Sequence, residues 1–382
     1  MELEEKGDAG SARDGQEEGL THIKSVSRVK HRILHNYLPT WARILGSANR
    51  RLCYFDCYAG PGRYESDGEP VDGSPMIAVR AAKRFLLIRP DHFITLVLIE
   101  KGAANVRLLE KHLEELKPYP TQLSVEVFAA DSKTLVPDLL SQTPELAPSF
   151  FMVDPYGHPM SIPIINEVLS RPKTEALINL MWYRINMDLG NPAVHPLLDR
   201  LFGDGSWRDE SFMRQSGIPR EEGFLRYFCS RLKARFVFPF RIGFDREDRV
   251  FGPRTKYYLV HASNHMRALL LMKEVMWPLG DEVGTFAFSG EPQGVLISRA
   301  PKQEELREIL RREFQGRRVE FDKIREMTWR LPFLEKHYRA VITELRAEGI
   351  VRVTPVTSKR TGIKGKDLVE FLTSEINPRN RE

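Results

Sequence analysis

Four acidic residues each stand at the end of a predicted apolar strand. Asp56 closes RLCYFD, Glu100 closes HFITLVLIE, Asp131 closes LSVEVFAAD and Asp154 closes SFFMVD. The carboxyl ends of parallel strands meet at one edge of a sheet, where α/β proteins bind ligands. A carboxylate there is costly to desolvate unless it accepts hydrogen bonds, and a nucleoside could satisfy several at once. The alternative is that each acid caps the helix that follows it.

A glycine turn follows the first of these acids. The sequence DCYAGPGRY places Gly60 and Gly62 just after Asp56, and glycine lets a ligand approach the backbone closely. Further on, DGSP opens a predicted helix with Ser74 as candidate N-cap, and a helix N-terminus attracts anionic groups. We expect the intervening loop, RYESDGEPVDG, to fold over a cofactor or substrate.

The spacing of these residues distinguishes between two candidate cofactors. A dinucleotide site would read G-x-G-x-x-G at the helix start, with an acid about 20 residues on. Glu100 instead lies 44 residues after Asp56. We therefore predict S-adenosylmethionine, with Glu100 on the ribose hydroxyls and Asp131 on the adenine amine. The predicted cofactor-binding residues are Asp56, Gly60, Gly62, Ser74, Glu100 and Asp131.

The stretch VDPYGHP follows the fourth strand and supplies the candidate catalytic residues Asp154, Pro155 and Tyr156. It resembles the Asp-Pro-Pro-Tyr motif of methyltransferases that modify amino groups of nucleic acids. There, oxygen acceptors bind a target amine and an aromatic ring stacks on its base. Here Tyr156 stands in place of the second proline, and Gly157 in place of the aromatic residue. A simple turn is the alternative.

Alternating strands and helices predict the fold that positions these residues. Near-continuous apolar strands indicate an α/β fold with a doubly wound, mostly parallel sheet of the S-adenosylmethionine-dependent methyltransferase type. We predict an acidic disordered tail over 1–22 and a Rossmann domain over 23–310 with a helical insertion near 184–250. A helix is expected to begin near residue 23 and to break or kink at Pro39. A small winged-helix domain is predicted over 318–382.

The C-terminal unit carries the candidate nucleic-acid contacts. LEKHYRAVITELRAEG would be a recognition helix, and the basic turn SKRTGIKGK the wing. DLVEFLTSEI could form a last short helix. Phosphate binding is the functional interpretation and a solvated basic surface the alternative. The predicted nucleic-acid-binding residues are His337, Arg339, Arg346, Lys359, Arg360, Lys364 and Lys366.

Other polar residues leave two interpretations open. Asn179 and Tyr183-Arg184 follow the fifth strand and could contact substrate or merely cap the strand. Lys30 and His31 precede a Tyr-Leu-x-x-Trp stripe, which favours core packing over base stacking. His31 and His35 lie four residues apart but lack a third ligand, so we predict no metal.

Composition limits the class of protein. The 382 residues carry a net charge of +5, which permits a nucleic-acid partner without requiring one. Three sparse cysteines without CxxC spacing argue against disulfides and zinc and predict reduced thiols in the cytoplasm. The polar N-terminus lacks the apolar segment of a signal peptide, and no apolar run reaches membrane-spanning length.

Five segments resemble the three-Cys-motif partner proteins, a prokaryotic family: DCYAGPGRY, DGSP, FFMVDPYG, TEALINLMWY and YYLVHASNHMRALLLMKEVM. The resemblance covers about residues 25–280. It implies a methyltransferase-like Rossmann domain, often joined to a winged helix, and a partner that is a radical-S-adenosylmethionine-like protein with three cysteines. The namesake cysteines belong to that partner.

Two functional hypotheses follow. The first is an S-adenosylmethionine-dependent methyltransferase-like protein that acts on or binds DNA or RNA. The second is a catalytically silent Rossmann scaffold that senses a nucleotide or docks a partner protein, and binds DNA through its winged helix. The displaced aromatic in VDPYG favours the second.

Overall fold

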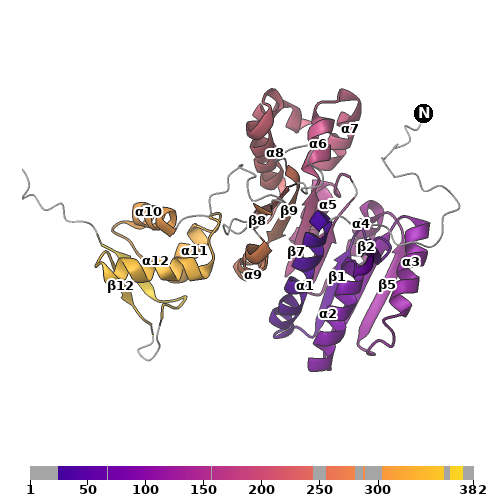
Figure 1. Ribbon diagram of the computed structural model, residues 1–382, viewed down its shortest axis with the longest axis horizontal. Helices are drawn as coiled ribbons and strands as arrows, with labels where there is room; N and C mark the ends of the chain where they lie inside the picture. The colour runs from indigo at the N-terminus through magenta and orange to yellow at the C-terminus, as the bar shows by residue number, and fades with distance from the viewer. Residues whose placement is uncertain are drawn as a thin grey trace, which may run out of the picture.

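An eight-stranded, mostly parallel sheet organises the larger part of the molecule (Figure 1). This computed structural model describes residues 25–66, 68–155, 157–243, 255–279, 287–288, 303–356 and 362–372. The strand order is β10-β8-β9-β7-β6-β1-β4-β5. The chain moves outward from β1 to β5 and then returns to the other side of β1, so the order reverses between β1 and β6. Ligands of doubly wound folds bind at such a reversal.

The strands β1, β4, β5, β6 and β7 run parallel. β9 runs antiparallel to both β7 and β8. The predicted doubly wound, mostly parallel α/β fold is therefore confirmed. The strand bounds are β1 Arg51–Asp56, β4 Phe93–Glu100, β5 Leu123–Ala129, β6 Ser149–Val153, β7 Thr174–Leu180, β8 Phe236–Gly243, β9 Thr255–Ser263 and β10 Ala287–Phe288.

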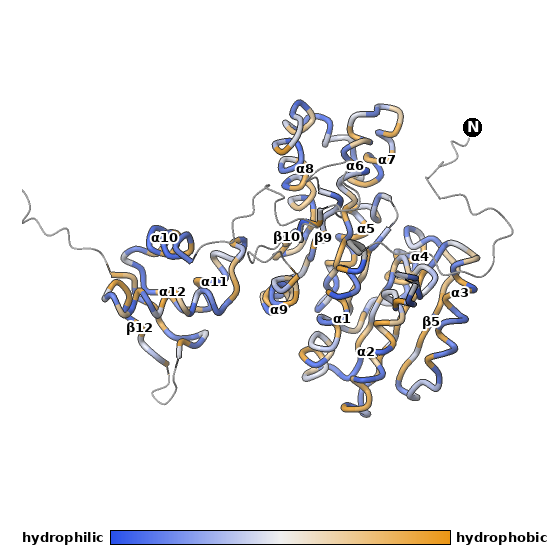
Figure 2. Tube along the Cα trace, in the orientation of Figure 1, coloured by the Kyte–Doolittle hydropathy of each residue, from blue (hydrophilic) through white to orange (hydrophobic). Residues whose placement is uncertain are grey.

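Helices cover both faces of this sheet, because successive strand residues point to opposite sides. Tyr54 packs in one hydrophobic cluster with α1, α2, α3 and α9, whereas Phe55 packs in a second cluster with α4 and α5. Figure 2 shows hydrophobic residues concentrated along the strands between these layers. The bounds are α1 Ser25–Gly46, α2 Ser74–Ile88, α3 Ala103–Glu114, α4 Ser132–Gln142, α5 Ile162–Ser170 and α9 Met266–Met276.

Helix α1 is tied to the sheet by a buried polar network. Tyr37 Oη donates to Glu175 Oε2 over 2.6 Å, and His261 Nε2 lies 2.8 Å from the same oxygen. The helix continues through Pro39, so the predicted break there is wrong. Proline removes one backbone hydrogen bond, and the buried contacts on both sides of it hold the helix together.

Two inserted segments differ from their sequence predictions. The loop after the glycine turn is a hairpin of β2 Arg63–Ser66 and β3 Glu69–Asp72. The insertion after β7 is helical over α6 Trp182–Leu189, α7 His195–Phe202 and α8 Gly217–Arg231. Residues 236–243, which we assigned to that insertion, form strand β8 within the sheet, because alternating buried residues pair them with β9.

The C-terminal unit has its own core. It contains α10 Gln303–Phe314, β11 Arg318–Glu320, α11 Phe321–Met327, α12 Glu335–Ala347, β12 Val351–Thr354 and β13 Leu368–Phe371. Leu306, Leu310 and Phe314 of α10 lie in this core, so the unit begins before the predicted boundary at 318. The predicted last helix is wrong at 368–371, where alternating buried residues form β13 between β11 and β12.

A joint connects the two units through the turn between α11 and α12. The buried Lys273 of α9 donates to the backbone carbonyls of Trp329 and Leu331, over 2.5 and 2.8 Å. The Trp329 ring packs edge-on against Phe236 at 5.5 Å. Leu334 belongs to the hydrophobic cluster of the sheet domain. The C-terminal unit is therefore seated on the sheet domain by buried contacts.

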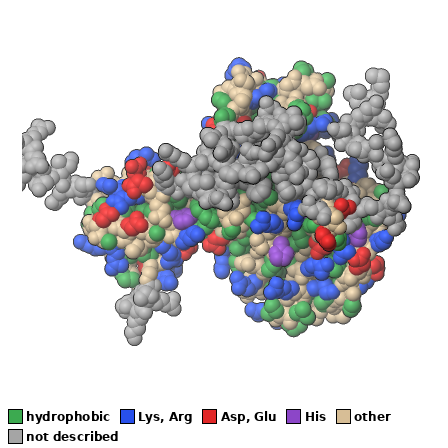
Figure 3. Space-filling model, viewed as in Figure 1, with side chains coloured by type: hydrophobic (Ala, Val, Ile, Leu, Met, Phe, Trp, Pro, Cys, Tyr) green, Lys and Arg blue, Asp and Glu red, His purple; other side chains and the backbone are tan. Residues whose placement is uncertain are grey.

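On the one face drawn in Figure 3, the visible basic side chains are spread out rather than gathered in one patch. Lys and Arg occur there on both units and are mixed with Asp and Glu. The described helices include none that is long and apolar enough to span a membrane. The predicted N-terminal tail lies outside the described residues.

Candidate functional site

The turn after β1 has the backbone conformation that glycine favours. Gly60 and Gly62 have φ angles of +64° and +85°. A Cβ added at Gly60 would lie 2.5 Å from Tyr64 Oη, and one at Gly62 would lie 3.0 Å from Leu109 Cδ1. Both the backbone angle and the crowding therefore require glycine.

Asp56 is completely buried at the end of β1. Its carboxylate accepts hydrogen bonds from Tyr54 Oη at 3.0 Å and from the Tyr58 N–H at 3.4 Å. Burial raises the pKa of Asp56 to about 6, against the hydrogen bonds from Ser74 and Tyr54, and the nearby Asp154 raises it further. An ionised carboxylate in this position is costly unless a cationic or hydrogen-bonding ligand compensates it.

Ser74 contacts the site in a different way from the one predicted. Gly73, rather than Ser74, is the N-cap of α2, and Pro75 occupies the first turn. The Ser74 hydroxyl instead hydrogen-bonds Asp56. The Gly73 N–H donates to the Gly62 carbonyl over 2.7 Å, which brings the start of α2 against the glycine turn.

Asp154 lies just beyond β6 and is held by two elements distant in sequence. Lys30 Nζ of α1 lies 2.5 Å from its Oδ2, and Asn179 Nδ2 donates to its Oδ1 over 2.6 Å. The exposed fractions of the Lys30 and Asp154 side chains are only 12% and 17%. Pro155 is buried beside it, while Tyr156 lies outside the described residues.

Helix α1 supplies two site residues, Lys30 and His31, that precede the stripe of Tyr37, Leu38 and Trp41, which is buried in the core as predicted. Lys30 pairs with Asp154, and its ammonium also lies 5.7 Å from the centre of the Tyr257 ring. His31 is buried, and burial together with Lys30 lowers the pKa of His31 to about 4. The lysine before the apolar stripe is visible in the sequence, but its partner Asp154 lies 124 residues further along the chain.

The two remaining strand-end acids each accept a hydrogen bond from the turn of chain that follows them. Glu100 accepts from the Gly102 N–H over 2.8 Å and also from the Gly60 N–H over 2.9 Å. Asp131 caps α4 by accepting from the Lys133 N–H over 2.9 Å. Partial burial works to raise the pKa of Asp131, but the Lys133 N–H and the Lys101 ammonium outweigh it and hold that pKa below its usual value.

Two buried hydroxyls near Asp131 bear on the fit of a nucleoside. Tyr58 Oη and Ser132 Oγ lie close enough for Ser132 to act on the pKa of Tyr58, but neither makes a hydrogen bond of good geometry among the residues that the structure describes. Buried polar atoms normally have partners. Together with the glycine turn and the strand-end acids, they form a donor and acceptor set that fits the adenosine part of S-adenosylmethionine.

Two of the predicted nucleic-acid contacts face the protein itself. His337 Nδ1 accepts from the Leu334 N–H over 3.1 Å, and its ring lies 4.6 Å from that of Trp277 across the joint. Burial lowers the pKa of His337. Arg339 forms an ion pair with Glu335.

The other described basic candidates are at the surface. Arg346 is exposed in the last turn of α12, and Lys364 and Lys366 are exposed before β13. Lys359 and Arg360 lie outside the described residues. The three described residues keep their predicted accessibility for a phosphate backbone.

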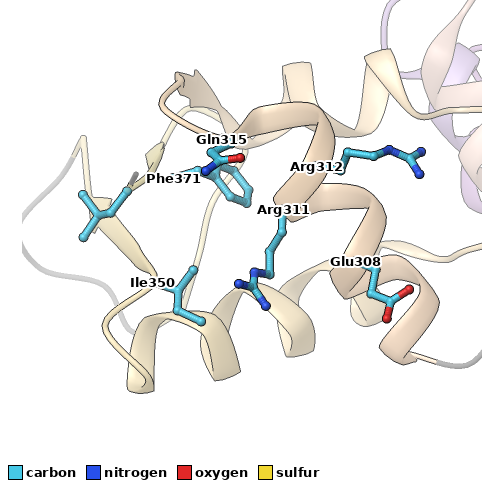
Figure 4. A pocket seen from close by; sticks show the side chains of 7 residues that line it. Glu308, Arg311, Arg312, Gln315, Ile350 and Phe371 are labelled. Atoms are coloured by element: carbon cyan, nitrogen blue, oxygen red, sulfur yellow. The ribbon is translucent and has the colours of Figure 1, made fainter. Parts of the chain in front are cut away.

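A separate pocket of about 300 Å³ lies within the C-terminal unit (Figure 4). Arg311, Arg312 and Glu308 of α10 line it together with Ile350 and Phe371. None of the predicted site residues contributes to this pocket, so it is distinct from the carboxyl edge of the sheet.

Comparisons with known proteins show no family for this chain. No protein-family model matches the chain, and no curated protein matches it. The resemblance to the three-Cys-motif partner proteins therefore stays a prediction.

Several solved structures are similar at low identity. Protein LPL1258 from Legionella pneumophila shares 13% identity over 63% of this chain and 85% of its own, with a TM-score of 0.39. A putative class I S-adenosylmethionine-dependent methyltransferase from Listeria monocytogenes shares 7% over 64% and 63%, with a TM-score of 0.32. Human methyltransferase-like protein 13, in complex with SAH, shares 12% over 65% and 89%, with a TM-score of 0.28. We base no functional argument on likenesses this distant. The strand order itself shows that the chain has a methyltransferase-like Rossmann fold.

Proposed function

We propose that the protein is an S-adenosylmethionine-dependent methyltransferase that acts on an amino group of DNA or RNA. The observation that carries this proposal is the pair of acids at the strand-order reversal. Asp56 and Asp154 lie at the ends of neighbouring strands, beside a left-handed glycine turn and the start of α2, and the nearby Asp154 helps to raise the pKa of Asp56.

Each cofactor-binding residue has a role that its position supports. Asp56, Gly60, Gly62 and Ser74 would hold the methionine and ribose side, Glu100 the ribose hydroxyls and Asp131 the adenine amine. Glu100 keeps a lone pair beyond its two backbone bonds, and Asp131 is partly exposed. The cofactor would supply a methyl group activated by an adjacent sulfonium.

Asp154 and Pro155 would orient the amine that receives the methyl group. The carboxylate and the Pro155 carbonyl would accept its N–H groups, and Tyr156 would stack on the base. Lys30 and Asn179 would fix the carboxylate, because each donates to a different oxygen. Alignment of the amine is the main requirement of such a transfer.

The C-terminal unit would deliver the nucleic acid. We propose that its three helices and three-stranded antiparallel sheet are a winged helix, with α12 as recognition helix and residues 357–366 as the wing. Arg346, Lys364 and Lys366 would contact phosphates, with Lys359 and Arg360. His337 and Arg339 would contribute only after leaving the contacts they make with Trp277 and Glu335.

A specific observation favours the silent scaffold as the second candidate. Both oxygens of Asp154 already accept a hydrogen bond from the protein, so a target amine would compete for the remaining lone pairs. In this alternative the sheet domain binds the nucleotide and docks the three-cysteine radical-S-adenosylmethionine-like partner without transferring a methyl group.

Calorimetric titration with S-adenosylmethionine and S-adenosylhomocysteine tests the cofactor. We expect micromolar binding that Asp56→Ala abolishes and that Asp138→Ala, at an exposed acid of α4, leaves unchanged. Absence of binding to the unaltered protein would refute the methyltransferase proposal.

Transfer of a labelled methyl group then separates the two candidates. The protein is incubated with labelled cofactor and either total RNA or genomic DNA, alone and with the three-cysteine partner. We expect labelling that Asp154→Ala removes. Cofactor binding without labelling, together with co-purification of the partner, would favour the scaffold.

A further inference from the structure

Lys30 brings a positive charge from outside the sheet to its carboxyl edge. It lies in the second turn of α1, whereas Asp154, its partner at 2.5 Å, is 124 residues further along the chain. Both side chains are largely buried, so solvent screens this pair much less than a surface pair. The pair is therefore an electrostatic component of the site.

Asn179 holds the oxygen of Asp154 that Lys30 does not contact. Its Nδ2 donates to Asp154 Oδ1 over 2.6 Å, and its own Oδ1 is buried with no hydrogen-bond partner among the described residues. The Lys30 ammonium lies against the other oxygen, so two donors from distant segments fix the carboxylate.

The charges around this position can be counted. Asp56 and Asp154 are the two neighbouring acids, and Lys30 contacts the second of them. His31 is neutral at pH 7, because burial and Lys30 lower its pKa to about 4. Asp72, the next acid, is paired with Arg63 and Arg80. Arg28 is a second cation near His31, and its guanidinium donates to Ser66. Lys30 contacts Asp154 directly and therefore compensates one of the two negative charges of the strand-end acids.

We propose that Lys30 is a specificity-determining residue that sets how strongly the site prefers the cationic S-adenosylmethionine over the neutral S-adenosylhomocysteine. The inference rests on the proposed function. The two ligands share every group except the methylated sulfur, which carries one positive charge in the substrate and none in the product. Lys30 reduces the electrostatic attraction between the acids and that positive charge. The affinity for the substrate therefore does not greatly exceed the affinity for the product. It also fixes Asp154 for the target amine.

The test measures the ratio of the two dissociation constants by calorimetry, which requires no methyl acceptor. Lys30→Met removes the charge and keeps most of the side-chain volume. We expect it to raise the preference for S-adenosylmethionine about tenfold, because one unit charge is lost beside the strand-end acids in a poorly screened site. Lys30→Arg should keep the original ratio.

Two further variants control this experiment. Arg32→Met removes the same charge from an exposed position of α1 and should change the ratio less than twofold. Lys30→Met combined with Asp154→Asn removes both members of the pair and should restore the ratio to within about threefold of the original. The double variant also avoids an unpaired buried acid, so it provides a readout if Lys30→Met unfolds.

The outcomes separate this inference from the proposed function. Binding of both ligands with a ratio that Lys30→Met leaves unchanged would overturn the role of Lys30 and spare the cofactor assignment. A ratio that Arg32→Met changes as much would also overturn it, because the effect would then be long-range. No binding of either ligand to the unaltered protein would overturn both.

Discussion

The carboxyl edge of the sheet has two halves that use the same residue types differently. The inner half holds Asp56 and Asp154, at the ends of β1 and β6, and their partners come from α1, α2 and β7. The outer half holds Glu100 and Asp131, at the ends of β4 and β5, and each accepts an N–H two residues further along the chain. Hydrogen bonds from the following turn thus satisfy part of each carboxylate in the outer half without a ligand. Asp56 also accepts an N–H two residues further along, from Tyr58, but over 3.4 Å and while fully buried, so this contact does not account for its burial.

This difference shows what an acid at a strand end can and cannot indicate. A carboxylate that its own next turn satisfies carries little information about function. A carboxylate buried against another acid, with its pKa raised to about 6, has a cost in folding that a ligand would offset. Four predictions use this contrast.

The largest expected effect is a difference between the two halves in how much each contributes to cofactor affinity. Asp56→Ala should weaken S-adenosylmethionine binding at least about 100-fold, because it removes a buried charged hydrogen-bond acceptor. Asp131→Ala should weaken it by no more than about tenfold, since its side chain is one-third exposed. Calorimetry measures both, and equal losses would show that the halves do not differ in this way.

The second prediction concerns the turn that joins the halves, where the Gly60 N–H donates to Glu100. Gly62→Ala should lower the free energy of unfolding by about 3 kcal/mol, through the strained φ of +85° and the contact with Leu109. Gly68→Ala is the matched control. Its φ is +80° but a Cβ there meets nothing within 4 Å, so about 1 kcal/mol is expected. If Gly62→Ala and Gly68→Ala lowered the free energy of unfolding equally in urea denaturation, the turn at Gly62 would tolerate a side chain.

The third prediction is that substitutions in the two halves change the free energy of unfolding in opposite directions. A raised pKa in the folded state means that the folded protein binds the Asp56 proton more tightly than the unfolded chain, so the free energy of unfolding falls between about pH 4 and pH 6 and stays lower above pH 6. Asp56→Asn should therefore increase the free energy of unfolding at pH 8 by about 2 kcal/mol. Asp131→Ala should decrease it by about 1 kcal/mol, because α4 loses its N-cap.

A pH series checks this assignment. The benefit of Asp56→Asn should vanish as the pH falls from 8 to below 4, where the aspartate is protonated in both states. A benefit that persists at pH 4 would have a cause other than ionisation.

The smallest effect is a pH dependence of binding. If the cofactor requires an ionised Asp56, its affinity should rise about tenfold from pH 5 to pH 7.5, because the free site titrates near pH 6. Asp56→Asn should bind weakly at both pH values, whereas Asp131→Ala should keep the rise. A rise retained in Asp56→Asn would assign the titration to another group.

The sheet and the positions of its acids were predictable because both depend on local patterns. Continuous apolar strands such as FITLVLIE imply a parallel sheet, and parallel strands bring their last residues to one edge. The glycines after Asp56 were predictable for the same reason. What could not be read from the sequence was which of these acids would be buried.

The missed features depend on contacts between distant segments. Lys30 and Asp154 meet only once α1 is packed on the sheet, and no spacing rule links positions 124 residues apart. The role of Ser74 changed because Gly73 caps the helix and frees its hydroxyl for Asp56. Strand β13 was mistaken for a helix because a four-residue apolar segment fits either period.

The contact at Lys273 restricts which C-terminal units could replace the present one by domain recombination. Burial lowers the pKa of that amine to about 7, and its acceptors are two main-chain carbonyls contributed by the other unit. Any C-terminal unit acquired by recombination would have to present carbonyls at the same place, whatever its side chains. Descendants that lose the unit would be expected to replace this lysine with an apolar residue, and sequences that keep it to retain the length of the turn from 328 to 334.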